Sequence, residues 1–291
     1  MSNFEILAEG LQFPEGPIAM PDGSVILVEI KRKTLTRVWN GKSEVIAEIG
    51  GGPNGAAFGP DGAIYLTNNG GFEFHDISGL TIPGHAASDY TTGRIERVDL
   101  ATGRVERLYD NFEGQRLSGP NDLVFDKSGG FWFTDLGKNY KRSSDRGGLY
   151  YAKTDSSLLK EASMGMSASM ASGFRQMKRS STRPRPETAK LWAFDITGEE
   201  RSGRTTRWAV PRGGASLCSP IISFFDSLAL QANGDVCVAT ILNGGVTTIT
   251  PQGVSAAPFP DDHDQYLFRR RRHERRVHHA LSHRQAGEGR S

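Results

Sequence analysis

The chain has 291 residues, of which 37% are hydrophobic and 23% are charged, with 35 glycines against 14 prolines. This composition supplies enough apolar material for a folded core and excludes collagen, a coiled coil and wholesale disorder. The formal net charge is +2, but residues 261–291 alone contribute +3. The rest of the chain is nearly neutral, so we expect no nucleic-acid partner for it.

No apolar run is long enough to span a membrane, and the first residues lack the basic and apolar regions of a signal peptide. We therefore expect a cytoplasmic protein without a membrane partner. Cys218 and Cys237 are the two cysteines of the sequence. Two cysteines exclude a disulfide framework and a cysteine-rich zinc site.

Four segments of the sequence share one pattern. They begin at Pro14, Pro53, Pro120 and Phe225. Each continues with a polar side chain, a short apolar stretch, a glycine turn and an alternating apolar strand, which is a hairpin signal. The polar residue lies eight positions before the turn glycine in all four, and these residues are Glu15, Asn54, Asn121 and Asp226.

Further hairpin turns and the repeat spacing predict the architecture. The turns are Asn40-Gly41, Thr102-Gly103, Thr197-Gly198 and Gln252-Gly253. Short strands at a period of about 40 residues predict an all-β fold, a six-bladed β-propeller with four-stranded blades. The long spacing between the third and fourth units leaves room for one more blade. We assign residues 1–262 to one propeller domain and expect an inserted loop over 71–92, either a lid or a plain surface loop.

The repeated polar residues are the candidate site. Rotation about a propeller axis brings equivalent positions of different blades to one end of the central channel. Carboxylate and amide oxygens gathered there suit a hard divalent cation such as calcium, magnesium or manganese, and suit zinc less well. The alternative is that each side chain caps its own strand by binding nearby backbone amides.

Several of these segments resemble one known family. They are FPEGP near the start, SGPNDLVFDKSGGFWFTDLG, RGGLYYAKTD, LWAFDITG and FFDSLALQANGDVCVATILNGG. The chain is similar to the gluconolactonase, regucalcin and luciferin-regenerating enzyme family over about 13–151 and 191–252. The resemblance implies a six-bladed propeller with one divalent metal ion, calcium first, that hydrolyses a sugar-type lactone as its small-molecule substrate.

The same resemblance assigns site residues. Glu15 and Asp226 match metal ligands, and Asp226 is also a candidate for activating water. Asn121 matches a residue that faces the metal or the substrate, so we place it in both the catalytic and the metal set. Asp122 and Ser227 match positions that act as ligands in some lactonases.

Asn54 is a candidate substrate-binding residue or secondary ligand because of its place in the repeat, and the family resemblance does not assign it. Lactone hydrolysis by a polarised carbonyl and a metal-activated water needs no serine nucleophile, and the sequence contains no G-x-S-x-G motif. Two rival functions are a phosphotriesterase-like hydrolase of the same fold and a non-enzymatic calcium-binding or interaction propeller. The sequence leaves the oligomeric state open.

Two segments depart from the family pattern. Residues 162–186 show neither strand alternation nor a propeller turn, and 263–291 form an Arg- and His-rich tail without lysine. Read one frame over, permissible codons for the first segment give NGIGLSPDEKIVYAAET, which has the family's Asn and turn. We interpret both segments as frame-shifted and expect an incomplete fourth blade, an open ring and weak activity. A disordered tail and a basic arm for nucleic acid or an anionic membrane surface are the alternatives.

Overall fold

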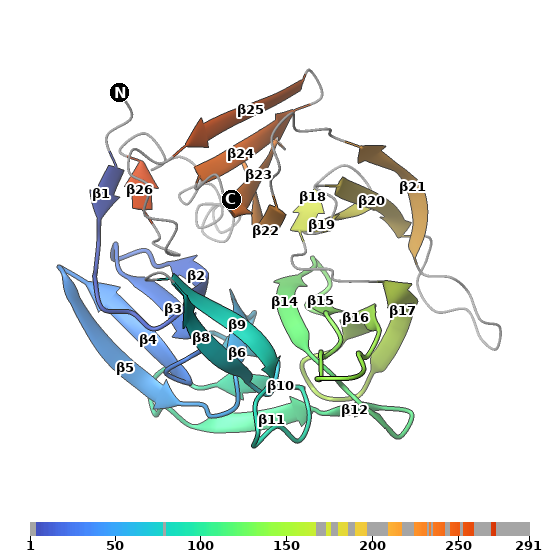
Figure 1. Cartoon of the computed structure of the whole chain (residues 1–291), viewed down its shortest axis with the longest axis horizontal. Coiled ribbons are helices and arrows are strands. Elements are labelled where there is room, and N and C mark those ends of the chain that lie inside the picture. Colours follow the sequence, from blue (N-terminus) through green and yellow to red (C-terminus); the bar gives the residue numbers. More distant parts are fainter. Residues whose placement is uncertain are drawn as a thin grey trace, which may run out of the picture.

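The structure is a computed structural model that describes residues 4–77, 80–166, 173–175, 180–185, 190–196, 209–216, 224–231, 233, 235–241, 245–250, 253–258 and 269–271. Every regular element in these residues is a β-strand, and the sheets are arranged in a ring (Figure 1). The predicted all-β propeller is therefore confirmed. This described part of the chain includes no helix of the length and apolar character that crossing a membrane requires.

The first three blades each contain four antiparallel strands. Blade 1 consists of β2 (Pro14–Ala19), β3 (Val25–Glu29), β4 (Thr34–Trp39) and β5 (Lys42–Glu48). Blade 2 consists of β6 (Pro53–Phe58), β7 (Ile64–Asn68), β10 (Arg94–Val98) and β11 (Val105–Tyr109). Blade 3 consists of β14 (Pro120–Phe125), β15 (Phe131–Asp135), β16 (Gly147–Ala152) and β17 (Leu159–Met166).

Two more four-stranded blades follow. Blade 4 consists of β18 (Gly173–Arg175), β19 (Ser180–Arg185), β20 (Lys190–Ile196) and β21 (Ala209–Ser216). Blade 5 consists of β22 (Phe224–Leu230), β23 (Val236–Ile241), β24 (Gly245–Thr250) and β25 (Gly253–Pro258). The first strands of the five blades lie nearest the centre of the ring in Figure 1.

The last position of the ring lies between blades 5 and 1. Among the described residues it holds a two-stranded sheet, in which β1 (Phe4–Ile6) pairs with β26 (Arg269–Arg271). Of the Arg- and His-rich tail, residues 263–268 and 272–291 lie outside the described residues.

Blade 4 corrects one expectation from the sequence. Residues 162–186 lack strand alternation and were expected to leave the fourth blade incomplete, but β18 and β19 fall within this range and pair with each other. β19 also pairs with β20, whose sequence KLWAFDI has the usual strand character. Ladder hydrogen bonds join backbone groups, so a neighbouring strand can be extended by a segment without alternating side chains.

The turn chemistry agrees with the sequence where it is described. Asn40 and Gly41 have φ angles of 50° and 73°, the left-handed pair that a two-residue hairpin turn requires. The repeated turn glycines Gly23, Gly62 and Gly129 have φ angles of 87°, 81° and 82°. The turns at Thr197-Gly198 and Gln252 lie outside the described residues.

Apolar side chains pack between neighbouring blades. One buried cluster joins blades 1 and 2 and includes Val28, Leu35, Ile64 and Leu66. Another joins blades 2 and 3 through aromatic residues such as Tyr65. Phe131 and Phe133 belong to this second cluster, and both rings are fully buried. Burial of such large rings is the main favourable term that holds adjacent sheets together.

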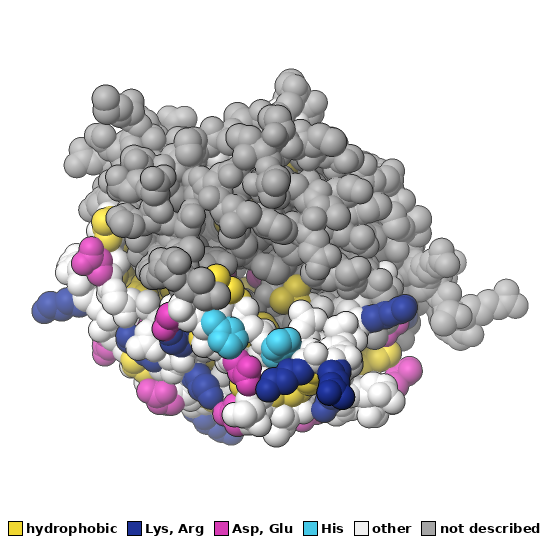
Figure 2. All heavy atoms as spheres, in the orientation of Figure 1, with side chains coloured by type: hydrophobic (Ala, Val, Ile, Leu, Met, Phe, Trp, Pro, Cys, Tyr) yellow, Lys and Arg dark blue, Asp and Glu magenta, His cyan; other side chains and the backbone are white. Residues whose placement is uncertain are grey.

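The insertion after blade 2's second strand is a hairpin, not the expected irregular loop. It consists of β8 (Phe72–Ile77) and β9 (Leu80–Ala86), which pair antiparallel. Phe74 contacts Phe13 of the segment before blade 1, with ring centroids 5.3 Å apart. His75 and His85 are exposed, and Figure 2 shows His side chains beside charged ones on one face. Ladder pairing satisfies the backbone groups of this long insertion, which a loop would leave to solvent.

Two short strands before blade 3 complete the description. β12 (Asn111–Phe112) and β13 (Gln115–Arg116) form a small hairpin. It leads directly into the segment that precedes β14.

Candidate functional site

The repeated polar residues lie at ladder irregularities in the first strands. The pairing of first and second strands shifts register between Glu15 and Ile18, Pro53 and Ala56, Pro120 and Leu123, and Phe225 and Leu228. Each irregularity therefore falls at or beside one of the four residues Glu15, Asn54, Asn121 and Asp226, which we call the ring residues. A bulge changes the direction of a side chain and interrupts strand pairing. The first strands of four blades therefore share the same interruption at the ring residue.

Glycines beside the ring residues let the first strands approach closely. A Cβ on Gly16 would lie 2.5 Å from the backbone nitrogen of Ala56, and a Cβ on Gly55 would lie 2.6 Å from the carbonyl oxygen of Asn121. Any larger residue at either position would push neighbouring blades apart. The two glycines therefore bring the ring residues of blades 1, 2 and 3 together.

The side chains of the ring residues meet across blades. Asn54 Nδ2 of blade 2 donates a hydrogen bond of 2.6 Å to Asn121 Oδ1 of blade 3. Ser227 Oγ of blade 5 lies 3.1 Å from Glu15 Oε2 of blade 1, across 212 positions of sequence. Glu15, Asn54 and Asn121 are each 7% exposed. Blades 1 and 5, which are far apart in sequence, thus meet through the side chains of Glu15 and Ser227.

The remaining predicted site residues lie next to these contacts. Asp226 is in β22 beside Ser227, and its side chain lies outside the described part. Asp122 follows Asn121, is half-buried, and its amide lies 3.3 Å from Thr134 Oγ1. The structure therefore pairs Asn54 with Asn121 and Glu15 with Ser227, and it leaves the side chain of Asp226 undescribed.

Thr67 is a contact residue that the sequence did not single out. Its Oγ1 accepts a hydrogen bond of 2.7 Å from the amide of Gly55 and donates one of 2.6 Å to the carbonyl oxygen of Asn121. The side chain is fully buried. Because this hydroxyl both accepts and donates, it links the first strands of blades 2 and 3, β6 and β14, directly.

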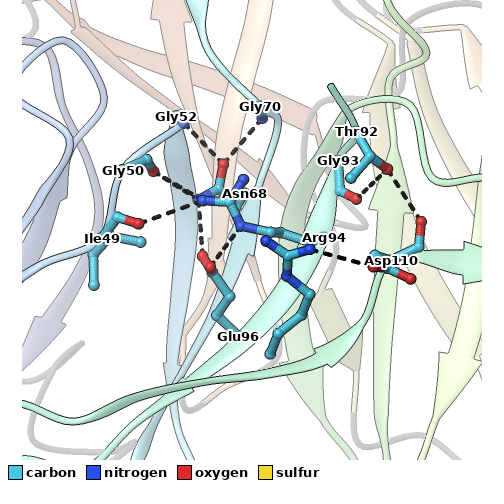
Figure 3. A network of polar contacts seen from close by, with 11 residues as sticks. Ile49, Gly50, Gly52, Asn68, Gly70, Thr92, Gly93, Arg94, Glu96 and Asp110 are labelled. Atoms are coloured by element: carbon cyan, nitrogen blue, oxygen red, sulfur yellow. Dashed lines mark hydrogen bonds and ion pairs between the residues drawn. The ribbon is translucent and has the colours of Figure 1, made fainter. Parts of the chain in front are cut away.

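A buried polar network holds the blade 2 side of the site (Figure 3). Arg94 Nε donates to Glu96 Oε1 at 2.5 Å, and Asn68 Nδ2 donates to Glu96 Oε2 at 2.8 Å. Asn68 Oδ1 in turn accepts from the amide of Gly52 at 2.8 Å. Because all three side chains are buried, each depends on its partners for its orientation.

Lys138 is a second feature missed by sequence reasoning. It follows β15, is 1% exposed, and donates from Nζ to the carbonyl oxygen of Asn69 at 2.7 Å. Its ammonium also lies 3.9 Å from the ring centroid of Phe72 and 5.0 Å from that of Tyr90. Burial lowers the pKa of Lys138 to about 7, opposed by the nearby charge of Asp135. A lysine in a loop gives no sequence pattern that distinguishes it from a surface residue.

The donor set fits a hard cation. Glu15 offers a carboxylate, and Asn54 and Asn121 carry carboxamide oxygens, which are the ligand types that calcium takes. Within the described residues no group of three His, Cys, Asp or Glu side chains converges. Asp226, the second carboxylate of the predicted set, is outside that search because its side chain is undescribed.

A separate cavity of about 330 Å³ lies on the blade 3 side. It is lined by Arg116, Arg146, Glu161 and Asp135, among others, and by none of the ring residues. Burial, and then the charge of Glu113, raises the pKa of Glu161. This cavity is therefore distinct from the candidate site.

Sequence comparisons identify relatives of the chain. The family profile described as the SMP-30/Gluconolactonase/LRE-like region matches residues 13–261. A gluconolactonase from Zymomonas mobilis subsp. mobilis is 29% identical over 146 residues, which cover 45% of this chain and 35% of that protein. The match thus spans about a third of the length of this curated relative.

Structural comparisons support the fold. A gluconolactonase from Xanthomonas campestris superposes with a TM-score of 0.64 and 17% identity, covering 89% of this chain and 80% of that one. Regucalcin from Agrobacterium tumefaciens strain C58, described as a calcium-binding protein, superposes with a TM-score of 0.65 and 15% identity. That alignment covers 90% of this chain and 79% of regucalcin. At such identities the likeness concerns the fold alone.

Proposed function

Because this chain belongs to the SMP-30/Gluconolactonase/LRE-like family, we propose that it hydrolyses a sugar-type lactone at the ring residues. The observation that supports the proposal is a pair of polar contacts between blades. Asn54 and Asn121 join blades 2 and 3, and Glu15 and Ser227 join blades 1 and 5.

We propose that Glu15, Asn121 and Asp226 hold one divalent ion, calcium first, with magnesium, manganese or zinc as alternatives. When bound, such an ion polarises a carbonyl and lowers the pKa of a bound water. Asp226 is the proposed base that accepts the proton from the attacking water.

The chain's own contacts give the other residues their roles. Ser227 fixes one carboxylate oxygen of Glu15, and Asn54 fixes the carboxamide of Asn121. Asn121 is therefore held in one orientation by its neighbour in blade 2. We assign substrate or secondary ligand contacts to Asn54, Asp122 and Ser227.

Hydrolysis of gluconolactone with and without a chelator tests this proposal. We expect turnover that a chelator abolishes and calcium restores. Asp226→Asn removes the proposed base, so its kcat should fall by about 10²–10⁴-fold. Asp155→Asn changes an exposed turn residue of blade 3 in the same chemical way and should keep full activity. Turnover that resists the chelator would contradict metal dependence.

The likeness to calcium-binding regucalcin keeps one alternative open. Calcium binding without lactone turnover would support a non-enzymatic propeller. Turnover of a phosphotriester in place of a lactone would instead support a phosphotriesterase-like hydrolase of the same fold.

The frame-shift hypothesis adds an expectation about rate. β18, the first strand of blade 4, reads Gly-Phe-Arg and supplies no Asn at the position where the family resemblance places a ligand. We propose that the chain as written binds its ion weakly and turns over slowly. Sequencing the gene across codons 160–291 tests the frame directly, and a chain carrying the re-read blade 4 segment should bind calcium more tightly.

A further inference from the structure

The last residue of the second strand is a buried acceptor in three blades. These residues are Glu29, Asn68 and Asp135, and they are 0%, 0% and 3% exposed. Each is paired in the ladder with the proline that immediately precedes a ring residue: Glu29 with Pro14, Asn68 with Pro53, and Asp135 with Pro120. The same position of the repeat therefore carries a polar side chain where apolar burial would be the norm.

In every case the acceptor binds backbone amides just upstream of the ring residue. Glu29 Oε2 accepts from the amide of Gln12 at 2.6 Å. Asn68 Oδ1 accepts from the amide of Gly52 at 2.8 Å. These amides lie two or three positions before Glu15 and Asn54.

Blade 3 repeats this arrangement with more donors. Asp135 Oδ2 accepts from the amide of Ser118 at 2.9 Å, and Oδ1 accepts from those of Gly119 and Gly137, both at 2.7 Å. Burial raises the pKa of Asp135, and the three amides oppose this shift because they stabilise the ionised carboxylate. Ser118 and Gly119 directly precede Pro120 and thus Asn121.

The bulges give this arrangement a physical reason. Where the ladder is interrupted, strand pairing does not fix the direction of the ring residue. The backbone amides just before that residue also need an acceptor other than a ladder carbonyl. In blade 1 the intervening residue, Phe13, has a φ of 56°, which is strained for a bulky residue before proline. Such a conformation persists when its surroundings hold it in place.

We propose that Glu29, Asn68 and Asp135 are positioning residues, each of which fixes the orientation of the ring residue in its own blade. The functional half of this inference rests on the proposed metal-dependent hydrolysis. The structural half, control of Glu15, Asn54 and Asn121 by these acceptors, does not.

Asp135→Asn is the main test. The substitution keeps the size of the side chain but replaces one of its two acceptor oxygens, so either Ser118 or the glycine pair loses its partner. We expect whichever amide loses its acceptor, Ser118 or Gly119, to exchange hydrogen at least about 10-fold faster, because a lost net bond of about 1.4 kcal/mol is a tenfold change. The side-chain amide resonances of Asn121 should shift as well.

Function provides a second, separate readout. Loss of a residue that orients a metal ligand without contacting the metal typically costs about 10–100-fold in metal affinity or activity. We therefore expect Asp135→Asn to weaken calcium binding in calorimetry and to lower kcat by that amount, with a smaller change in KM. Asp126→Asn, at the opposite end of the same β14–β15 hairpin, is the matched control and should leave the binding, kcat and Asn121 resonances unchanged.

The outcomes separate the two proposals. Unchanged amide exchange and unchanged Asn121 resonances in Asp135→Asn would overturn the positioning role whether or not the protein is a lactonase. Shifted resonances with wild-type calcium affinity and kcat would overturn its functional half. If the wild type neither binds calcium nor hydrolyses lactone, the proposed function fails, and the exchange measurement still decides the structural half. Glu29→Gln, at the position where one backbone amide and the Thr36 hydroxyl bind the carboxylate, serves if Asp135→Asn does not fold.

Discussion

Blades 2 and 3 place their ring residues in direct contact but hold them by different chemistry. In blade 2 the acceptor is the neutral amide of Asn68, which the buried Arg94–Glu96 pair orients. In blade 3 the acceptor is the carboxylate of Asp135, which binds three backbone amides. The comparison shows that the repeat conserves a geometric requirement, and that two different side-chain sets meet it.

Removing the charged partner in blade 2 should have the largest effect. Arg94→Met leaves the buried Glu96 carboxylate without the guanidinium that balances its charge, so the free energy of unfolding should fall by about 3–5 kcal/mol. Urea denaturation measures this change. The double variant Arg94→Met/Glu96→Leu should recover part of the loss, because no isolated charge remains.

An exposed ion pair on the same strand supplies the control for that experiment. Arg97 binds Asp61 at 2.7 Å, with the two side chains 26% and 37% exposed. Arg97→Met should cost at most about 1 kcal/mol. Equal losses in Arg94→Met and Arg97→Met would contradict the role of the buried network.

The contact between the two blades is tested next. Gly55→Ala places a Cβ within 2.6 Å of the Asn121 carbonyl oxygen, and backbone atoms must shift to accept it. We expect a loss of about 1–3 kcal/mol in thermal denaturation, accompanied by lower lactone turnover, because overpacking displaces the ring residues. A variant with wild-type melting temperature would show that blades 2 and 3 do not approach so closely.

The buried Lys138 should make the folding stability depend on pH. The pKa of Lys138 is about 7 in the folded protein, whereas the ordinary pKa of a lysine side chain, which applies to the unfolded chain, is 10.5. Between these values the unfolded chain binds more protons, so folding stability rises with pH, by at most about 1.4 kcal/mol per pH unit for one group.

Urea midpoints between pH 7 and pH 9 measure this slope. Lys138→Met should flatten it, because the titrating group is gone. Tyr90 lies beside Lys138, and burial raises its pKa well above this window, so it does not contribute. A slope that survives in Lys138→Met would assign the pH dependence to another group.

The smallest effect is expected where blades 1 and 5 meet. Ser227→Ala removes the bond to Glu15 and should cost about 0.5–1.5 kcal/mol, with a matching loss of calcium affinity. Ser157→Ala, in an exposed turn, is the control and should leave calcium affinity unchanged. Equal affinities for wild type and Ser227→Ala would mean that Glu15 needs no such support.

The sequence could predict the blades because they repeat. The polar residue eight positions before each turn glycine and the Asn40-Gly41 turn follow from local chemistry. The structure pairs Asn54 with Asn121 and Glu15 with Ser227. The strands β18 and β19 of blade 4 were not predicted, because backbone pairing does not require an alternating pattern.

Periodicity and turn residues by themselves determined the fold class and the ring residues, since both depend on neighbours close in sequence. Only the tertiary structure decided which side chains hold that ring. Glu29, Asn68, Asp135, Thr67 and Lys138 act on groups that other strands and loops bring to them, and their residue types differ from blade to blade. Glu29, Asn68 and Asp135 each lie 14 positions after a ring residue, but their residue types differ, so packing and burial alone assign them their partners.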